Sequence, residues 1–572
     1  MFIALAIIFI AGQVGLELKM PEYMSTITRL VQTEGGEMGE ILRNGAMMLL
    51  CAFGSLLSTI IAGWFVANVG ADFTFITRKM IFDKVERLGI NEIKKFSTAS
   101  LITRTTNDVT QVRMVITMGA NMLIRAPMSA IWAIAKISGK SWQWSTATAV
   151  AVIIMLTTVI TIMVIVTPRF KIIQKLTDSL NGVTRENLTG IRVVRAFNAE
   201  KYQENKFDIA NTKVADTTRF VNRVLSLMSP MMYLVMNGIT LTIYLIGASL
   251  ISQSIMSDKL TVFSDMIIFS TYAMHVIMSF LMVAIIFMMI PRAQVSAERI
   301  NEVLDEKITI EDGDFDDDTA EVGTVEFRNV SFKYPDAEEY LLKDISFRAE
   351  RGQTVAFIGS TGSGKSTLIN LVPRFYDATD GAVFVDGVNV KDYKQKVLHR
   401  KLGYIPQKAI IFSGTVASNI SYGDNGKTKP SERKIQEAAK VAQAKNFVEK
   451  LDRQYNAHIA QAGTNISGGQ KQRLAIARAV ARNPEIYIFD DSFSALDYKT
   501  DANLRKALND YAKDATSLIV AQRIGTIMHA DQILVLDKGR CVGRGTHEEL
   551  LKNCEVYKEI ALSQLTKEEL NV

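Results

Sequence analysis

The chain has 572 residues, of which 48% are hydrophobic and 22% are charged, and its mean hydropathy is positive. This length exceeds that of one ordinary domain. The composition fits a chain that is half membrane-embedded and half soluble better than it fits a uniformly soluble enzyme. The net charge is +6 without a large basic tract. Because cytoplasmic loops beside a membrane carry an excess of Lys and Arg, nucleic-acid binding is not needed to explain this charge.

Apolar segments dominate the first half of the chain, and most reach the roughly 20 residues that a bilayer span requires. The six segments are Phe2–Leu16, Met47–Val69, Met114–Ser138, Thr146–Val166, Leu225–Ile251 and Val262–Ile290. The first is short, and we expect it to continue as a helix past Lys19 and Pro21, where it partly lines a cavity. It lacks the basic start and cleavage site of a signal peptide. We therefore expect a first transmembrane helix, with any amphipathic leader absent or outside this chain.

The connections between these segments alternate in charge. Residues 70–113 and 167–223 are long and rich in Lys and Arg, so the positive-inside rule places them in the cytoplasm. At their turning points, Asn91–Ser97 and Asn187–Phe197 are predicted to be short helices presented to a cytoplasmic partner. The other connections are short or not basic and belong on the opposite side: residues 17–43, 139–145 and 252–261.

Polar side chains inside membrane spans are functional candidates by default. Asn237 and His275 would either line a pocket or form hydrogen bonds between helices. We expect Asp265 to lie at the outer mouth of its helix. We expect Arg125, which is close to Pro127, to extend its charge toward the membrane interface. The many methionines of the last two spans would form either an adaptable pocket or, as we favour, lipid-facing surface.

The composition changes after Pro291. An amphipathic stretch, Ala297–Leu304, precedes the acidic and turn-like Glu311–Asp318. A compact, strand-rich pattern then begins near residue 322. We predict three parts: a transmembrane domain with two long intracellular loops at 1–305, a linker at 306–321 and a soluble domain at 322–572.

A glycine-rich loop lies near the start of the soluble domain. The apolar run TVAFIG leads into Gly359-x-x-x-x-Gly364-Lys365-Ser366, a P-loop in the required context of strand, loop and helix. The glycines let backbone N–H groups surround phosphate oxygens, and the following helix N-terminus adds partial positive charge. Lys365 would reach the terminal phosphates, and the Ser366 hydroxyl would bind Mg²⁺. The predicted loop residues are Gly359, Ser360, Thr361, Gly362, Ser363, Gly364, Lys365, Ser366 and Thr367.

Two adjacent carboxylates end a second apolar run. Ile486–Phe489 has the length and composition of a buried strand, and Asp490 and Asp491 follow it directly. An acidic residue at the end of such a strand is well placed to hold a metal ion beside a bound nucleotide. The predicted fold is therefore an α-helical membrane domain of six long transmembrane helices followed by an α/β P-loop NTPase domain that binds nucleotide.

The segment Asn465–Gln470 reads NISGGQ and lies between the P-loop and the acidic strand. With this motif in this order, the chain resembles the ATP-binding cassette (ABC) transporters, specifically type I exporter half-transporters with six helices and one nucleotide-binding domain. The resemblance covers essentially the whole chain, including Phe96–Asp108 and Glu186–Glu200 in the cytoplasmic connections. The chain is most similar to the degenerate-site subunit of bacterial heterodimeric multidrug exporters.

The resemblance implies roles for residues outside the P-loop. Tyr334 matches the aromatic residue that stacks on adenine, and Gln407 matches the residue that touches Mg²⁺ and the attacking water. The implied metal-site residues are Ser366, Gln407 and Asp490. In the family, the signature motif closes over ATP held by the opposite subunit, and the loop matching Ser494–Asp497 crosses the dimer interface. The signature residues here are Ser467, Gly468, Gly469 and Gln470.

Two positions depart from the family pattern. The residue after the metal-site aspartate is usually Glu, poised against the attacking water, and here it is Asp491. The switch position usually holds His, and here it holds Gln522. Because Asp is one methylene shorter, its carboxylate should fall short of the water, and a displacement of about 1 Å can cost roughly a hundredfold in rate. Gln carries neither the charge nor the exchangeable proton of His. We predict slow turnover at this chain's own site.

These features predict ATP-driven export of a hydrophobic or amphiphilic substrate across the cytoplasmic membrane, with ATP and Mg²⁺ bound in the cytoplasm. Hydrolysis is expected mainly at the site of a second half-transporter subunit, in a heterodimer. The other expected partners are the lipid bilayer and a small-molecule substrate, and not nucleic acid. A homodimeric exporter is the main alternative, and an ATP-gated regulatory or channel-like ABC protein is a weaker one. The six spans argue against a soluble ABC ATPase.

Overall fold

The computed structural model describes residues 1–572 apart from 33–36, 140, 254, 256–258, 318 and 566–572. Parts of three predicted outer connections and the last residue of the predicted acidic linker segment lie outside the described residues. The chain forms two compact units. The first comprises Met1–Glu86 and Phe96–Glu306, and the second comprises Arg87–Lys95 and Lys307–Val572.

In the described residues, the first unit has six helical spans long and apolar enough to cross a membrane. They are α1 (Phe2–Gln32), α2 (Met38–Val85), the stretch from α4 to α6 (Thr98–Ile137), α7 (Trp142–Thr189), the pair α9 and α10 (Glu200–Gln253) and α11 (Lys259–Leu304). The six predicted spans are confirmed, and α1 continues through Pro21. The 48 residues of α2 rise about 70 Å, more than twice the ~30 Å hydrocarbon core. The long helices therefore continue beyond the bilayer.

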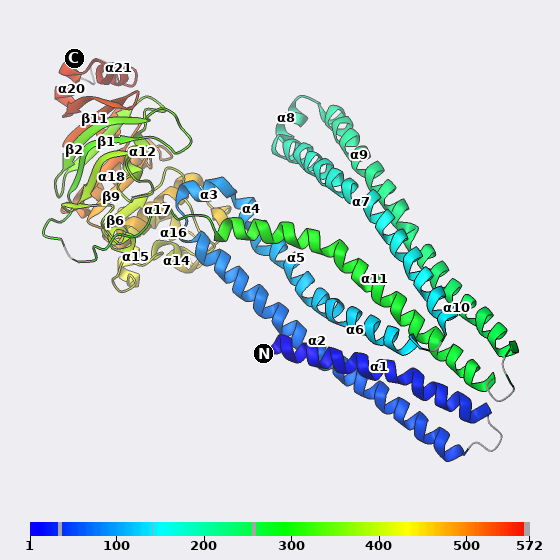
Figure 1. The fold of residues 1–572 in the computed structure, drawn as a ribbon. Coiled ribbons are helices and arrows are strands. Elements are labelled where there is room, and N and C mark those ends of the chain that lie inside the picture. Colours follow the sequence, from blue (N-terminus) through cyan, green and yellow to red (C-terminus); the bar gives the residue numbers. More distant parts are fainter. Residues whose placement is uncertain (33–36, 140, 254, 256–258, 318, 566–572) are drawn as a thin grey trace. The chain divides into compact units, whose positions relative to one another are not determined.

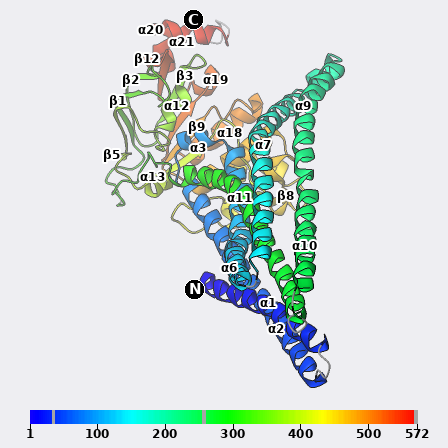
Figure 2. The same cartoon turned by 45° about the vertical axis from the view of Figure 1, so that its right-hand side comes forward.

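Helix pairs build the membrane unit. Helix α1 lies beside α2, and α7 lies beside α9, as both views show (Figures 1 and 2). Trp144 of α7 donates its indole N–H to the Ile243 carbonyl of α10 (3.2 Å) and packs against Phe269 of α11. Tyr272 of α11 donates its hydroxyl to the Leu18 carbonyl of α1 (2.7 Å). These buried contacts satisfy the polar groups of aromatic side chains that would otherwise be costly inside a membrane.

The third span is interrupted by two π-helical segments. It runs through α4 (Thr98–Thr103), η1 (Arg104–Asp108), α5 (Val109–Met114), η2 (Val115–Gly119) and α6 (Ala120–Ile137). Arg104 pairs with Glu302 of α11 (2.7 Å), and Asp108 accepts a hydrogen bond from the Ser296 hydroxyl (3.0 Å). These charged contacts fasten the start of the third span to the end of α11.

Short helices occupy the predicted turning points of the basic connections. They are α3 (Ile90–Phe96) and α8 (Ile191–Ala196), so the prediction of two short helices is confirmed. Residues 87–95 form part of the second unit. There, Lys94 donates to the Tyr376 hydroxyl (3.2 Å) and Glu92 accepts from the Thr309 hydroxyl. One short helix of a membrane-domain connection is thus attached to the soluble domain.

The second unit is built on two sheets. The larger has the order β12-β11-β3-β10-β9-β6, with parallel pairing from β11 to β6 and an antiparallel edge strand β12. The smaller is antiparallel, in the order β2-β1-β4-β5. The strands of the larger sheet are β3 (Thr354–Gly359), β6 (Leu402–Ile405), β9 (Ile486–Asp490), β10 (Thr516–Val520), β11 (Gln532–Asp537) and β12 (Arg540–Gly545). Those of the smaller are β1 (Val325–Phe332), β2 (Leu342–Ala349), β4 (Asp380–Val385) and β5 (Val388–Asn389).

Helices and a short two-stranded sheet complete this α/β domain. The helices are α12 (Lys365–Asn370), α13 (Gln395–Lys401), α14 (Val416–Ile420), α15 (Glu432–Val441), α16 (Lys445–Val448), α17 (Gly468–Arg482), α18 (Tyr498–Tyr511), α19 (Ile524–Ile527), α20 (His547–Asn553) and α21 (Glu555–Leu562). The strands of the two-stranded sheet are β7 (Gly414–Thr415) and β8 (His458–Ile459). Every residue of β9 is buried, as predicted from its continuous apolar run. Since β3, β9 and β10 are parallel neighbours, their carboxyl ends meet at one edge, which is where ligands bind in such sheets.

Candidate functional site

The P-loop joins the end of β3 to the start of α12. Gly364 precedes the helix with a φ of 94°, in the left-handed region that favours glycine. A Cβ there would lie 2.6 Å from the Leu342 side chain. Lys365 donates its ammonium to the carbonyl oxygens of Gly359 and Ser360, both at 2.8 Å. Burial lowers the pKa of Lys365, and the nearby Asp490 and Asp491 oppose that shift. This cationic loop at a helix N-terminus has the chemistry of a phosphate site.

Ser366 and Asp490 meet at the end of β9. The Ser366 hydroxyl donates to Asp490 Oδ1 at 2.6 Å, so two residues predicted to hold Mg²⁺ lie together. Burial raises the pKa of Asp490, and the bond from Ser366 opposes this rise. Among the described residues, no group of three or more His, Cys, Asp or Glu side chains could hold a metal. Hydroxyl and carboxylate oxygens suit Mg²⁺, which commonly completes its shell with phosphate and water.

Two glutamine side chains, those of Gln407 and Gln522, hold the carboxylate of Asp491. Its Oδ2 accepts from Gln407 Nε2 at 3.2 Å and from Gln522 Nε2 at 2.8 Å. The residue is buried and adopts a φ of 45°, a left-handed conformation that Asp tolerates better than most residues. Burial raises the pKa of Asp491, and the bond from Gln407 opposes this. One oxygen of this carboxylate is thus committed to two amide donors.

The backbone beside Gln522 is braced by Gln564, which follows α21. The Gln564 amide donates to the Gln522 carbonyl at 2.8 Å, and its oxygen accepts from the Ile524 backbone N–H at 2.8 Å. Sequence reasoning missed Gln564 because it belongs to no motif and lies 42 residues from Gln522. A continuous set of hydrogen bonds therefore runs from Gln564 through Gln522 and Asp491 to Gln407.

Tyr334 lies in an aromatic group near the P-loop helix. Its hydroxyl is 2.9 Å from the Thr367 hydroxyl, and its ring meets Phe332 and Tyr376 edge to face. The Lys94 ammonium lies 5.7 Å from the ring centroid. A stacking role for Tyr334 stays a prediction, while Lys94 is a neighbour that the sequence did not indicate.

The signature residues form the start of α17, apart from the hydrogen-bond network of Asp491. Ser467 caps this helix: its hydroxyl accepts from the Gln470 backbone N–H (3.3 Å), and the Gln470 side chain accepts from the Ser467 N–H (2.9 Å). Ser467 and Gly468 are exposed. A Cβ at Gly469 would lie 3.4 Å from the Ala495 carbonyl. This capped and accessible helix N-terminus carries partial positive charge.

Arg125 has a partner in the membrane unit that its expected extension to the membrane interface did not include. Its Nη2 donates to both carboxylate oxygens of Glu17 on α1, at 3.1 and 2.8 Å. The side chains of Arg125 and Glu17 are 30% and 18% exposed. An ion pair inside the helix group satisfies Arg125 where it stands, so extension to the interface is not required. Sequence reasoning missed Glu17, which lies 108 residues away.

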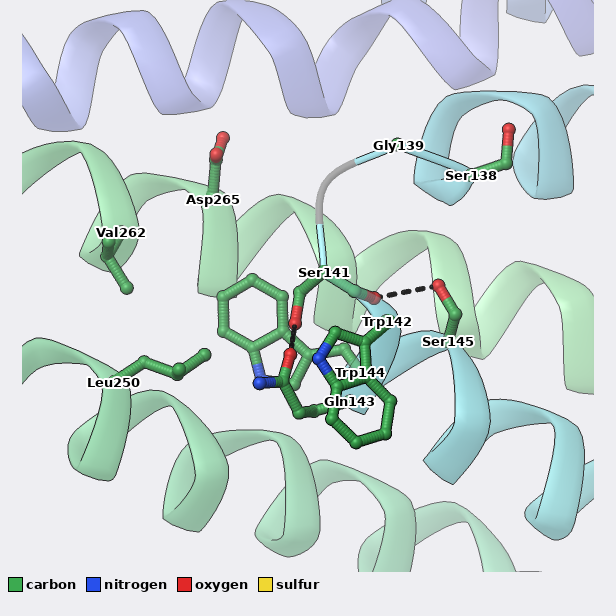
Figure 3. A pocket seen from close by; sticks show the side chains of 10 residues that line it. All are labelled: Ser138, Gly139, Ser141, Trp142, Gln143, Trp144, Ser145, Leu250, Val262 and Asp265. Atoms are coloured by element: carbon green, nitrogen blue, oxygen red, sulfur yellow. Dashed lines mark hydrogen bonds between the residues drawn. The ribbon is translucent and has the colours of Figure 1, made fainter.

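Asp265 lines a pocket of 700 Å³ together with the connection before α7 (Figure 3). Two tryptophans, Trp142 and Trp144, contribute to its wall, and Ser141 donates to the Gln143 side chain at 2.7 Å. This location agrees with the expected place of Asp265 at the outer mouth of its helix. Asn237 is exposed on α10, and His275 is half-buried on α11, so the alternatives for these two residues stay open.

Family models match both parts of the chain. The model described as the ABC transporter transmembrane region matches residues 3–287, and the model described as ABC transporter matches residues 342–494. Together they span most of both units.

Relatives match over most of their own length. An uncharacterized ABC transporter ATP-binding protein of Mycobacterium tuberculosis is 38% identical over 95% of this chain and 93% of that protein. The ATP-dependent lipid A-core flippase of Pseudomonas aeruginosa is 33% identical over 88% of this chain and 82% of the flippase. The structure of a bacterial Atm1-family ABC exporter with ATP bound superposes with a TM-score of 0.76 at 26% identity, covering 98% of each chain. The chain therefore belongs to the ABC transporter family, as a multi-pass membrane protein of exporter type with six membrane-spanning helices followed by an ATP-binding domain.

Proposed function

We propose that this chain is the degenerate-site half of a heterodimeric ABC exporter, which uses ATP to move a hydrophobic or amphiphilic substrate out across the cytoplasmic membrane. ATP binding closes two nucleotide-binding domains head to tail, and the long cytoplasmic helices carry that closure to the membrane domain. Differential affinity of ATP for the open and closed states drives this alternating access.

The observation that carries this proposal is the commitment of Asp491 to Gln407 and Gln522. A general base must lie within hydrogen-bond reach of the water that it activates. Burial, the larger effect, raises the pKa of Asp491, so we attribute slow hydrolysis to the geometry of the carboxylate and not to lowered basicity. Asp491 is one methylene shorter than Glu, and its Oδ2 accepts from both amides. Slow hydrolysis at this site follows from that arrangement.

Binding of ATP falls to other residues. The P-loop with Lys365 takes the phosphates, and Tyr334 offers an aromatic face to adenine. Ser366 and Asp490, which touch each other, would hold Mg²⁺, with Gln407 as a third candidate. The ion would neutralise charge on the phosphate oxygens. The site therefore holds nucleotide as a clamp rather than turning it over rapidly.

Hydrolysis takes place mainly at the partner's site, to which this chain contributes Ser467–Gln470. The exposed, capped start of α17 supports this role, because a helix N-terminus attracts phosphate. A homodimeric exporter remains the second candidate and would contain two slow sites. The two differ in composition: the heterodimer requires a second half-transporter with Glu and His at the positions of Asp491 and Gln522.

The substrate class rests on the membrane unit and on the relatives. Flippases of Pseudomonas species that act on lipid A-core are named among the relatives, and lipids are amphiphilic. The apolar, methionine-rich spans of the membrane unit suit such a substrate, because flexible thioether side chains adapt to varied apolar ligands. Both features favour an amphiphilic substrate.

A purification combined with a transport assay tests the proposal. The chain is tagged, isolated from native membranes and analysed for a stoichiometric second half-transporter. The isolated complex is then reconstituted, and accumulation of fluorescent amphiphiles is followed with ATP and with a nonhydrolysable analogue. We expect a heterodimer whose accumulation requires ATP hydrolysis. A homodimer, or a complex that only dissipates gradients, would contradict the proposal.

A further inference from the structure

A charged cluster joins α1, α2 and α6 inside the membrane unit. Glu17 accepts from Arg125 through both oxygens, from Gln13 at 3.0 Å and from Ser55 at 3.4 Å. Three of the six spanning helices thus contribute polar groups to one place, which we call the Glu17 cluster.

The position of the Glu17 cluster limits what its open side can face. Ionised side chains within membrane spans are costly, and they face a protein interior or a water-filled cavity rather than lipid. The Arg125 side chain is nevertheless 30% exposed and that of Glu17 is 18% exposed. The exposed part of this ion pair must therefore face the space between the helices of the assembled exporter.

Holding the helices together does not by itself explain the pair. Helices α1 and α6 already approach closely, since a Cβ at Gly15 would lie 3.2 Å from Trp132. Helix α1 is also tied to α11 by Tyr272 and the Leu18 carbonyl. A second acid–base pair, Glu22 with Lys136, links α1 and α6 farther along. An apolar pair of similar volume at Glu17 and Arg125 would often be at least as stable.

We propose that the Glu17 cluster is the headgroup site for a zwitterionic amphiphile, with Arg125 taking its phosphate or carboxylate and Glu17 taking its ammonium. This rests on the proposed function as an exporter of amphiphiles. The pair of Glu17 and Arg125 has no net charge. When a zwitterion binds, each of the two side chains pairs with the opposite charge of the headgroup, so no net charge enters the membrane. A purely anionic or cationic headgroup would leave one buried charge without a partner, which is costly.

Single neutral substitutions test the proposal because they should change charge preference in opposite directions. Binding of dodecylphosphocholine, dodecyl phosphate and dodecyltrimethylammonium is measured by tryptophan fluorescence on the purified complex in a neutral maltoside detergent without nucleotide. We expect the wild type to bind the zwitterion most tightly. Glu17→Gln should bind dodecyl phosphate about tenfold more tightly than the wild type, and Arg125→Gln should do the same for the cation, since each leaves one unpaired charge for the ligand.

Two further variants keep the test decisive. Lys136→Gln alters the neighbouring pair on the same helices and should keep the wild-type order of probes. The double variant Glu17→Gln/Arg125→Gln retains hydrogen bonding between the helices and should bind all three probes about equally. Equal weakening of every probe by both single variants, or an unchanged order in the double variant, would overturn the headgroup site. Because nucleotide is absent, that failure would leave the proposed ATP-driven export standing, whereas lack of transport by the wild type would not affect the binding result.

Discussion

At the scale of single residues, the central feature is the carboxylate of Asp491. The sequence alone shows that Asp and Gln stand where the family usually has Glu and His, at positions 491 and 522. The sequence does not contain the pairing itself, in which two amides share Oδ2. That geometry gives the proposed slow turnover a physical reason.

Restoring the usual residues should restore turnover at this site. In Asp491→Glu/Gln522→His, the carboxylate gains a methylene, the competing amide of Gln522 is gone, and the switch residue can carry charge. The measurement is ATPase activity of the assembled exporter whose partner lacks its own catalytic glutamate. We expect an increase of roughly a hundredfold over the same complex with the native residues. Asp491→Glu alone should give less, since Gln522 would still engage the carboxylate; no increase in the double variant would contradict this explanation.

Asp490 should show a trade between stability and ligand binding. Burial raises its pKa, so the ionised form is disfavoured in the folded state at neutral pH and its stabilising contribution lies at acidic pH. Asp490→Asn removes that buried charge and should raise the Tm of the nucleotide-free protein at pH 7 by about 2–4 °C. The same variant should lose the added stabilisation that Mg²⁺ gives to ATP-bound protein. Calorimetry with and without Mg·ATP measures both, and a lower Tm without nucleotide would refute the first part.

At the scale of elements, the sequence predicts what is local and misses what is distant. The six spans and β9 follow from continuous apolar runs, and the P-loop follows from a short motif between a strand and a helix. Glu17 and Gln564 were not predicted, because their partners lie 108 and 42 residues away. A side-chain pair across such a separation leaves no period or spacing in the chain. For the same reason the sequence did not show that residues 87–95 join the second unit.

Gln564, which follows α21, should fix the position of the backbone from Gln522 to Ile524, which we call the switch loop. In Gln564→Ala, the Gln522 carbonyl and the Ile524 N–H lose their side-chain partner, so Gln522 should hold Asp491 less firmly. We expect retention of ATP at this chain's own site to fall about threefold to tenfold, with each lost hydrogen bond contributing roughly 0.5–1.5 kcal/mol. Ser563→Ala is the matched control, because that hydroxyl bonds only the nearby Ile560 carbonyl among the described contacts.

Filter-bound nucleotide after gel filtration measures this retention. A double-mutant cycle with Gln522→Ala separates the switch-loop role from general stability, because the two substitutions should not be additive. Additive losses, or equal losses in Ser563→Ala, would show that Gln564 does not act through Gln522.

At the scale of the whole molecule, the proposed exporter is asymmetric, with one slow and one active ATP site. Both units match ABC transporter family models, and the chain superposes on an Atm1-family exporter over nearly its full length. Family membership predicts ATP use and alternating access but not which site turns over. The proposed division of labour, with ATP binding at this chain's site and hydrolysis at the partner's site, rests on Asp491, Gln522 and the accessible signature at α17.

The most direct test compares two substitutions in the assembled exporter. Asp491→Ala removes the carboxylate of this chain's site, and the partner's corresponding glutamate is replaced by Gln in a separate complex. Steady-state ATPase activity and ATP-driven transport are measured for both. The account predicts that Asp491→Ala keeps most of the wild-type turnover, while the partner's substitution lowers it by about a hundredfold or more. Equal losses from the two substitutions would contradict the asymmetric account.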